Sequence, residues 1–342
     1  MINMDRLSSV FSQCDLEHPV FREIYRVIGS LEEETESPLS TVPDAGDLEA
    51  DQSAEEESTP ETTGWSKDPQ SLIKSDSELM SLPDIYLRIE GVIKDPNSSA
   101  RHIAAIISQD PNLSAKLLKI VNSPFYGFRQ KIDTISRAVT IVGHNQISDL
   151  VLGTSVMALF REIPSNLMNM SLFWKHSVAC GTCARWIAGS RKFPNTESFF
   201  VAGLLHDLGK LIIFKNLPGP AKAVLRQVRY SDSFYYQTER DLIGFDHTQV
   251  GKALAEQWKL PSGLEQAIGG HHPPWSLPLD AEAALIFVAD NLANALGFGS
   301  SGERLVSPKL TYAVDLLSLP SDIWDNLIPV IKNQIEATVH LF

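Results

Sequence analysis

Apolar residues recur at helical spacing along nearly the whole chain from Ser71 onward. The spacing i, i+3, i+4, i+7 marks one buried face of an α-helix, whereas the alternation that marks a half-buried strand is scarce here. The pattern predicts helices near residues 76–93, 98–108, 112–121, 134–142, 144–160, 170–190, 196–214, 219–229, 234–242, 246–257, 261–269, 280–296, 308–317 and 320–340. The predicted fold class is therefore all-α, a multi-helix bundle.

The chain before this region has two parts of different composition. Residues 1–31 contain apolar side chains at helical spacing and predict a short N-terminal helix over 5–31. Residues 32–70 are rich in Glu, Asp, Ser, Thr and Pro, and residues 32–68 hold 13 acidic side chains and one basic one. Such a composition buries too little apolar surface to offset chain entropy, so 32–70 is predicted to be a disordered acidic linker.

The net charge and the cysteine content indicate which partners the protein can bind and in which redox compartment it lies. Residues 69–342 hold 25 acidic and 25 basic side chains, and this neutrality argues against nucleic acid as a partner. No run of about 18 apolar residues is present, and Met1–Arg6 lack the start of a signal peptide, so we expect no membrane association. The three cysteines fit a reducing cytoplasm better than a disulfide framework.

The tract at residues 203–210, GLLHDLGK, places a polar pair, His206-Asp207, inside an apolar helical stretch. Burying such a pair without partners costs several kcal/mol, so it is either a hydrogen-bonded core pair or part of a metal site. Further histidines and an aspartate follow on successive predicted helices. The ordered set comprises His176, His206, Asp207, His247, His271, His272 and Asp290. Imidazole and carboxylate ligands suit iron, manganese, zinc or a similar divalent ion, and seven of them can hold two ions that share a carboxylate.

This ordered set resembles the metal ligands of the HD superfamily of phosphohydrolases, above all its HD-GYP branch, which hydrolyses cyclic di-GMP. The resemblance implies that the seven residues are ligands of iron or manganese, that Asp207 belongs to the catalytic centre, and that Lys210 contacts phosphate. Two departures stand out. Leu172 occupies the place of an expected glutamate ligand, and His272 is followed by Pro273-Pro274-Trp275 where the branch has an acidic residue and a Gly-Tyr-Pro tripeptide.

The upstream half is similar to the HDOD domain, and the similarity extends from about Leu79 to about Pro274. It rests on four stretches in order: Leu82-Pro83, IISQDPNL at 106–113, KLLKIVNS at 116–123 and ISRAVTIVG at 135–143. The resemblance implies an HD-type bundle over 71–342 with an N-terminal helical HDOD subdomain at 71–160, a metal-site half at 161–300 and C-terminal helices at 301–342.

HDOD domains are regulatory relatives of HD hydrolases. The resemblance therefore implies a bacterial-type signal-transduction module that acts through a signalling protein partner or a nucleotide ligand and retains a metal site. The alternative is an active metal-dependent phosphohydrolase or phosphodiesterase on a nucleotide such as a cyclic dinucleotide. The sequence identifies neither the partner nor the oligomeric state.

Several other residues are predicted to have structural roles only. Asp110 and Asn122 are predicted to cap helix ends, and His102 to be exposed or capping. Cys180 and Cys183 have CxxC spacing but no second pair, so they are predicted to pack in the core.

Overall fold

The computed structural model describes residues 4–33, 68–75, 79, 81–160, 163–273 and 280–341, and these contain helices and no strand. The all-α prediction is confirmed. Most of the predicted linker, residues 34–67, lies outside the described residues, and so does the 274–279 segment. Within the described part, no helix is long and apolar enough to cross a membrane.

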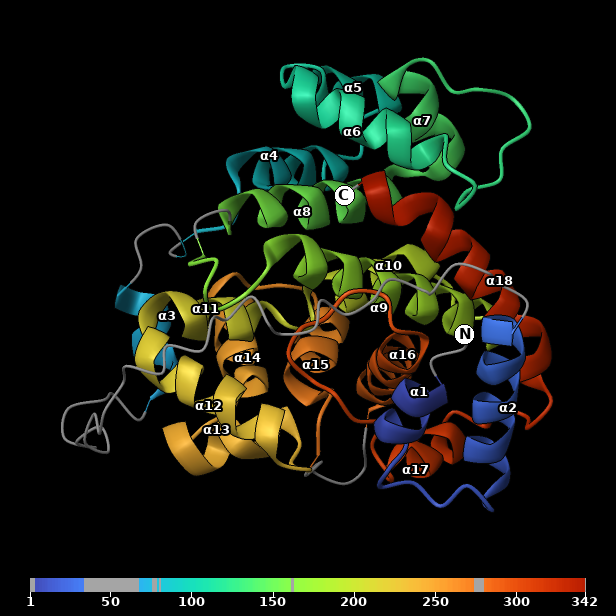
Figure 1. Ribbon diagram of the computed structural model, residues 1–342. Coiled ribbons are helices and arrows are strands. Elements are labelled where there is room, and N and C mark those ends of the chain that lie inside the picture. Colours follow the sequence, from blue (N-terminus) through green and yellow to red (C-terminus); the bar gives the residue numbers. More distant parts are fainter. Residues whose placement is uncertain are drawn as a thin grey trace.

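An N-terminal group of helices forms the upper layer in Figure 1. Its members are α4 (Asp84–Ile93), α5 (Ala100–Ile107), α6 (Pro111–Val121), α7 (Ile135–Val142) and α8 (His144–Leu159). Asp110 caps α6 by accepting hydrogen bonds from the backbone N–H groups of Asn112 and Leu113. Asn122 pairs with both backbone groups of Ile132, each at 2.7 Å, which fixes the long connection to α7. The capping roles predicted for Asp110 and Asn122 are thus confirmed.

The second group of helices packs beneath α8 and is centred on α9. Its members are α9 (Met170–Ser190), α10 (Thr196–Leu205), α11 (Leu208–Asn216), α12 (Pro218–Tyr230), α13 (Tyr235–Ile243), α14 (His247–Gln257), α15 (Ser262–Gly270) and α16 (Ala281–Leu296). Helices α9 and α10 cross at two glycines. A Cβ atom on Gly203 would lie 2.6 Å from the Cα atom of Gly181, so only glycine permits this approach. The crossing brings the part of α9 that carries His176 next to the end of α10, where His206 lies.

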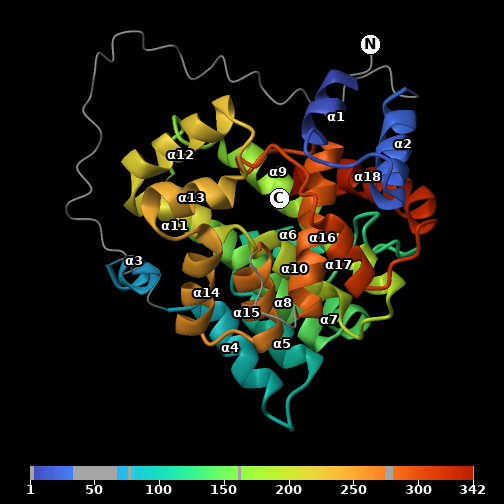
Figure 2. The same cartoon turned by 90° about the horizontal axis from the view of Figure 1, so that it is seen from below.

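The predicted helix over 5–31 is two helices instead of one. Helix α1 (Met4–Val10) and helix α2 (Pro19–Glu33) are separated by a turn. The two helices bury Leu7, Ile24 and Ile28 in the main core, and the turn buries Phe11 there. In Figure 2 they lie beside α17 (Leu310–Leu316) and α18 (Ile323–Thr338), which is followed by the short 3-10 helix η3 (Val339–Leu341). Packing against distant helices stabilises two short helices that would be marginal alone.

Two other helix predictions differ from the structure. Of the helix expected over 76–93, the structure has α4 over its second half, while residues 76–78 and 80 lie outside the described residues. A separate helix, α3 (Pro69–Ser75), begins inside the predicted linker and packs on α14. The helix expected over 196–214 is interrupted, because α10 ends at Leu205 and α11 begins at Leu208. The interruption falls on His206-Asp207, and both side chains turn to partners on other helices.

Candidate metal centre

The seven histidines and aspartates of the predicted set come from five places in the fold and meet in one buried cluster. His176 lies on α9, His206 and Asp207 lie between α10 and α11, and His247 is the first residue of α14. His271 and His272 follow the end of α15, and Asp290 lies on α16. All seven are between 0 and 6% exposed. Residues separated by more than 100 positions in the sequence therefore share one site.

Asp207 lies at the centre of this cluster, and each of its two carboxylate oxygens faces a different pair of histidines. Oδ1 lies 3.2 Å from His247 Nε2 and 3.7 Å from His271 Nε2. Oδ2 lies 3.2 Å from His206 Nε2 and 4.0 Å from His176 Nε2. A carboxylate in this position is suited to bridging two cations.

Asp290 completes the first group. Its Oδ1 atom lies 3.1 Å from His176 Nε2 and 3.7 Å from His206 Nε2. The ligand atoms of His176, His206 and Asp207 all lie within 4.8 Å of one another. Those of His247, His271 and His272 form a second group that meets the same limit.

Hydrogen bonds at the far side of three imidazole rings orient the rings and set their tautomers. His206 Nδ1 donates to Gly203 O at 2.7 Å, and His271 Nδ1 donates to Ile268 O at 2.8 Å. His247 Nδ1 donates to the carboxylate of Glu239, which also accepts the backbone N–H of His247 at 2.9 Å. With the proton on Nδ1, the Nε2 atom of each ring faces inward, as in histidines that bind metals.

The inward atoms repel one another unless a cation or proton lies between them. His247 Nε2 and His271 Nε2 are 3.3 Å apart, and both face an oxygen of Asp207. Both ring nitrogens of His176, Nε2 of His206 and Oδ1 of Asp207 are buried without a hydrogen-bond partner. Each such atom costs about 1–3 kcal/mol. The His and Asp clusters are thus compatible with a metal site, and the donor set of nitrogen and carboxylate oxygen fits a divalent transition metal.

The protonation of the cluster follows from burial and from its neighbours. Burial alone would raise the pKa of Asp207, but the positive charges of His206 and Lys210 hold it well below the usual value. Burial and the nearby Lys210 ammonium lower the pKa of His247 well below that of a free histidine. For His206, burial lowers the pKa, but the Asp207 carboxylate outweighs it and the net direction is upward. A metal ion would therefore displace a proton from His206.

Residues 79–274 match the family model of the HDOD domain. The chain belongs to the HDOD domain family.

Individual proteins are similar to this chain in sequence or in fold. An HDOD domain protein of unknown function from Geobacter sulfurreducens is 29% identical, with a TM-score of 0.66 over 80% of this chain and 97% of that one. A candidate phosphohydrolase from Shewanella amazonensis is 22% identical, with a TM-score of 0.64 over 79% of this chain and 97% of that one, and shares the fold. An uncharacterized protein of Treponema pallidum is 26% identical, and the match covers 57% of this chain and 38% of that protein's length.

Leu172, which the resemblance to the HD-GYP branch set in the place of a glutamate ligand, lies in the first turn of α9. The backbone carbonyl of Leu172 accepts a hydrogen bond from Ser300 N–H at 3.0 Å. The backbone of Gly299 runs so close to α9 that an added Cβ would lie 2.2 Å from that carbonyl oxygen. At this point α9 is therefore covered by the 297–307 loop.

Lys210 lies in the cluster but is engaged within the protein. Its ammonium group lies 2.9 Å from Asp207 Oδ2 and 3.1 Å from Ser301 Oγ, and it sits over the ring of Tyr235. The side chain is 1% exposed. Its contact with a phosphate, which the resemblance implied, stays a prediction.

Sequence reasoning missed Glu239, the partner of His247 on α13. Glu239 is fully buried, and burial raises the pKa of its carboxyl well above the usual value. The only indication in the sequence is a carboxylate eight residues before a histidine, which is too common a pattern to single out. His102 instead behaves as predicted, because its Nδ1 accepts the backbone N–H of Ser99 at the start of α5. Cys180 and Cys183 are buried free thiols.

Proposed function

We propose that this HDOD protein is a signal-transduction module that holds a pair of divalent metal ions, iron or manganese, and relays a signal by binding a protein or nucleotide. One ion would be held by His176, His206, Asp290 and Asp207. The other would be held by His247, His271, His272 and Asp207. The observation that carries the metal proposal is the convergence of inward-facing Nε2 atoms on both oxygens of Asp207.

Bound metal ions would supply positive charge where buried nitrogen and oxygen atoms lack partners. They would cross-link α9, the junction of α10 and α11, α14, α15 and α16 through their ligands. The metal centre would then stabilise the arrangement of these helices, and loss of an ion would loosen it.

Binding is favoured over turnover by the state of Lys210 and by the surroundings of the cluster. A phosphohydrolase needs a cation that is available to the phosphoryl group and metal positions that the substrate can reach. Lys210 is already held by Asp207 and Ser301 and is 1% exposed, and the loop over Leu172 covers one side of α9.

The metal proposal is tested by elemental analysis of protein purified without oxygen or chelators. We expect about two transition-metal ions per chain, a loss of most of this metal in His206→Ala, and no loss in the control His144→Gln, which lies at the start of α8 away from the cluster. Protein that neither copurifies with a transition metal nor takes one up would refute it.

The signalling proposal is tested by turnover assays with cyclic dinucleotides, (p)ppGpp and simple phosphodiesters in the presence of iron, manganese or nickel. We expect no metal-dependent hydrolysis by the loaded protein.

The alternative function is an active metal-dependent phosphohydrolase, and one observation favours it. Asp207 faces both groups of histidines, as a bridging ligand of a two-metal hydrolase would. Hydrolysis that requires metal and is abolished by His206→Ala, with His144→Gln active, would establish this alternative and reject the signalling module.

A further inference from the structure

A cavity of about 690 Å³ opens between the two groups of helices, away from the metal centre. The upper wall comes from α4, α6 and α8, and the opposite wall from the start of α9 and from η3. None of the seven clustered histidines and aspartates lines it. Its volume is in the range of small-molecule sites, about 300–1,000 Å³.

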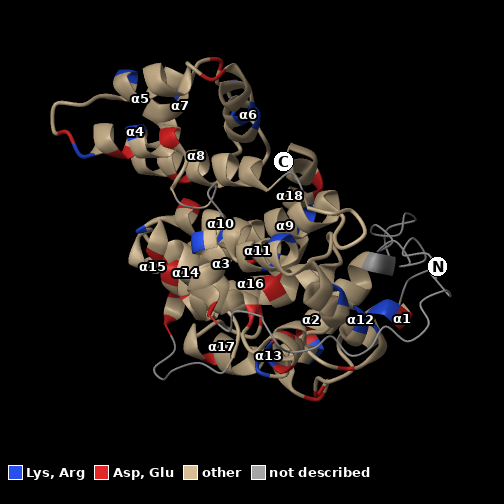
Figure 3. Ribbon diagram, turned by 90° about the vertical axis from the view of Figure 1, so that its left-hand side faces the viewer, with Lys and Arg blue, Asp and Glu red and all other residues tan. Residues whose placement is uncertain are grey.

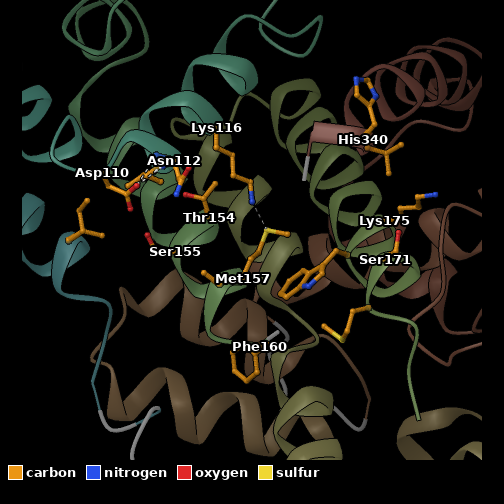
Figure 4. A pocket seen from close by; sticks show the side chains of 16 residues that line it. Asp110, Asn112, Lys116, Thr154, Ser155, Met157, Phe160, Ser171, Lys175 and His340 are labelled. Atoms are coloured by element: carbon orange, nitrogen blue, oxygen red, sulfur yellow. Dashed lines mark hydrogen bonds between the residues drawn. The ribbon is translucent and has the colours of Figure 1, made fainter. Parts of the chain in front are cut away.

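The charged groups around the cavity favour an anion. Lys116 on α6 extends into it, with its ammonium group 4.0 Å from the weak acceptor Met157 Sδ (Figure 4). Lys175 on α9 and His340 on η3 lie across from Asp110 and Asn112. The carboxylate of Asp110 is occupied as the cap of α6. Among the residues that line the cavity, Lys116 and Lys175 stand against one carboxylate, whereas acidic and basic positions are interspersed along the ribbon on the side drawn in Figure 3.

The uncharged lining favours a ring system with polar substituents. The indole of Trp174 is half-buried and is held edge-on against Phe173, with ring centroids 5.2 Å apart. Phe160 and Met157 give apolar surface on the α8 side, and the hydroxyls of Ser155 and Ser171 add hydrogen-bonding groups. Aromatic surface beside hydroxyls and ammonium groups is the chemistry that recognises a base, a sugar and a phosphate.

We infer that this cavity is the binding site of a nucleotide, with Lys116 and Lys175 contacting its phosphate and Trp174 contacting its base. The inference deepens the proposed signalling function, on which it rests, by naming the ligand class and its place. The site itself does not require metal, so the two proposals fail separately.

The cavity and the metal centre share helix α9. Trp174 and Lys175 immediately precede His176 on α9, and His176 Nε2 is 3.1 Å from Asp290. A nucleotide that contacts Trp174 and Lys175 would therefore bind to the same turn of α9 that carries His176. Nucleotide binding and metal binding are therefore expected to alter each other's affinity in the same ratio.

The test is isothermal titration calorimetry of the full chain with ATP, GTP, cyclic AMP and cyclic di-GMP. Pyrophosphate and adenosine serve as probes for the phosphate and the base alone. We expect at least one nucleotide to bind more tightly than either fragment. Lys116→Gln and Lys175→Gln should each weaken that binding about tenfold to a hundredfold, because each removes a charged hydrogen bond.

The matched control is Lys119→Gln, an exposed lysine on the same helix as Lys116 that does not line the cavity. Its affinity should stay within about twofold of the unchanged protein, and thermal melting should show all three variants folded. The inference is overturned if no nucleotide binds, if pyrophosphate binds as tightly as the nucleotides, or if both lysine variants bind unchanged. Binding that is lost in His206→Ala but kept in Lys116→Gln and Lys175→Gln would place the ligand at the metal centre instead.

Discussion

The crossing of α9 and α10 at Gly181 and Gly203 predicts an unusually costly glycine substitution. In Gly203→Ala, the new Cβ would lie 2.6 Å from Gly181 Cα, 2.7 Å from Gly181 N and 2.9 Å from the carbonyl carbon of Cys180. Carbon atoms in contact are normally about 3.5–4.0 Å apart, so the helices would have to separate by about 1 Å. All three neighbours are backbone atoms, which a side-chain rotation cannot move.

The expected cost follows from two opposing effects. Overpacking of a well-packed core costs about 1–3 kcal/mol, and backbone contacts place this case at the upper end. Alanine is favoured over glycine in a helix by about 1 kcal/mol. We therefore expect the free energy of unfolding to fall by about 1–2 kcal/mol, which with a urea slope of about 3 kcal/mol/M lowers the midpoint by roughly 0.3–0.7 M.

The control is Gly91→Ala on α4, an exposed helical glycine with nothing within 4 Å of the new Cβ. It should gain about 0.5–1 kcal/mol from helix propensity alone. Because His206 follows Gly203 by one turn, Gly203→Ala should also bind less metal, whereas Gly91→Ala should not. Equal urea midpoints for the two variants would refute the close crossing.

Three further predictions test other parts of the structure. Glu239→Gln, which weakens the acceptor of His247 Nδ1–H, should reduce metal affinity about 10- to 100-fold in a competition titration, while the exposed Glu256→Gln leaves it unchanged. Burial raises the pKa of Asp149 to about 6, so the folded state binds this proton more tightly than the unfolded state does, and Asp149 costs stability as the pH rises from about 4 to 6. Asp149→Asn should therefore raise the free energy of unfolding by about 1–2 kcal/mol at pH 8 and change it little at pH 4, and an equal gain at both would contradict the assignment. Deletion of residues 1–33 should lower the melting temperature by many degrees, because Leu7, Phe11, Ile24 and Ile28 lie in the main core, and an unchanged melting curve would show that α1 and α2 do not pack there.

Helix positions were predictable where a local chemical cue marks the end. Asp110, Thr134 and Asp246 each cap the helix that the sequence placed after them. The break at His206-Asp207 was not predictable from periodicity, because apolar residues continue on both sides. What ends α10 there is the demand of two polar side chains for partners on α9, α14 and α16, and a local window holds no information on those contacts.

The residues of the candidate site were likewise predictable only in part. The residues that meet in it were predictable because histidine and aspartate are conspicuous in apolar helices and occur in the order of a known motif. Glu239 was not, since acidic residues are common on helices and its contact with His247 depends on how α13 packs against α14. For the same reason, the packing of α1 and α2 was not predictable. Their apolar faces could be recognised in the sequence, but the helices against which they pack could not.

The location of Asp207 between two helices has a mechanical consequence. Its carboxylate is carried by a joint of the chain and not by the interior of a rigid rod, so a change in the angle between α10 and α11 swings both oxygens together. The distances from Asp207 to both groups of histidines would therefore change together whenever the angle between α10 and α11 changes. The geometry of the cluster thus depends on how these two helices lie.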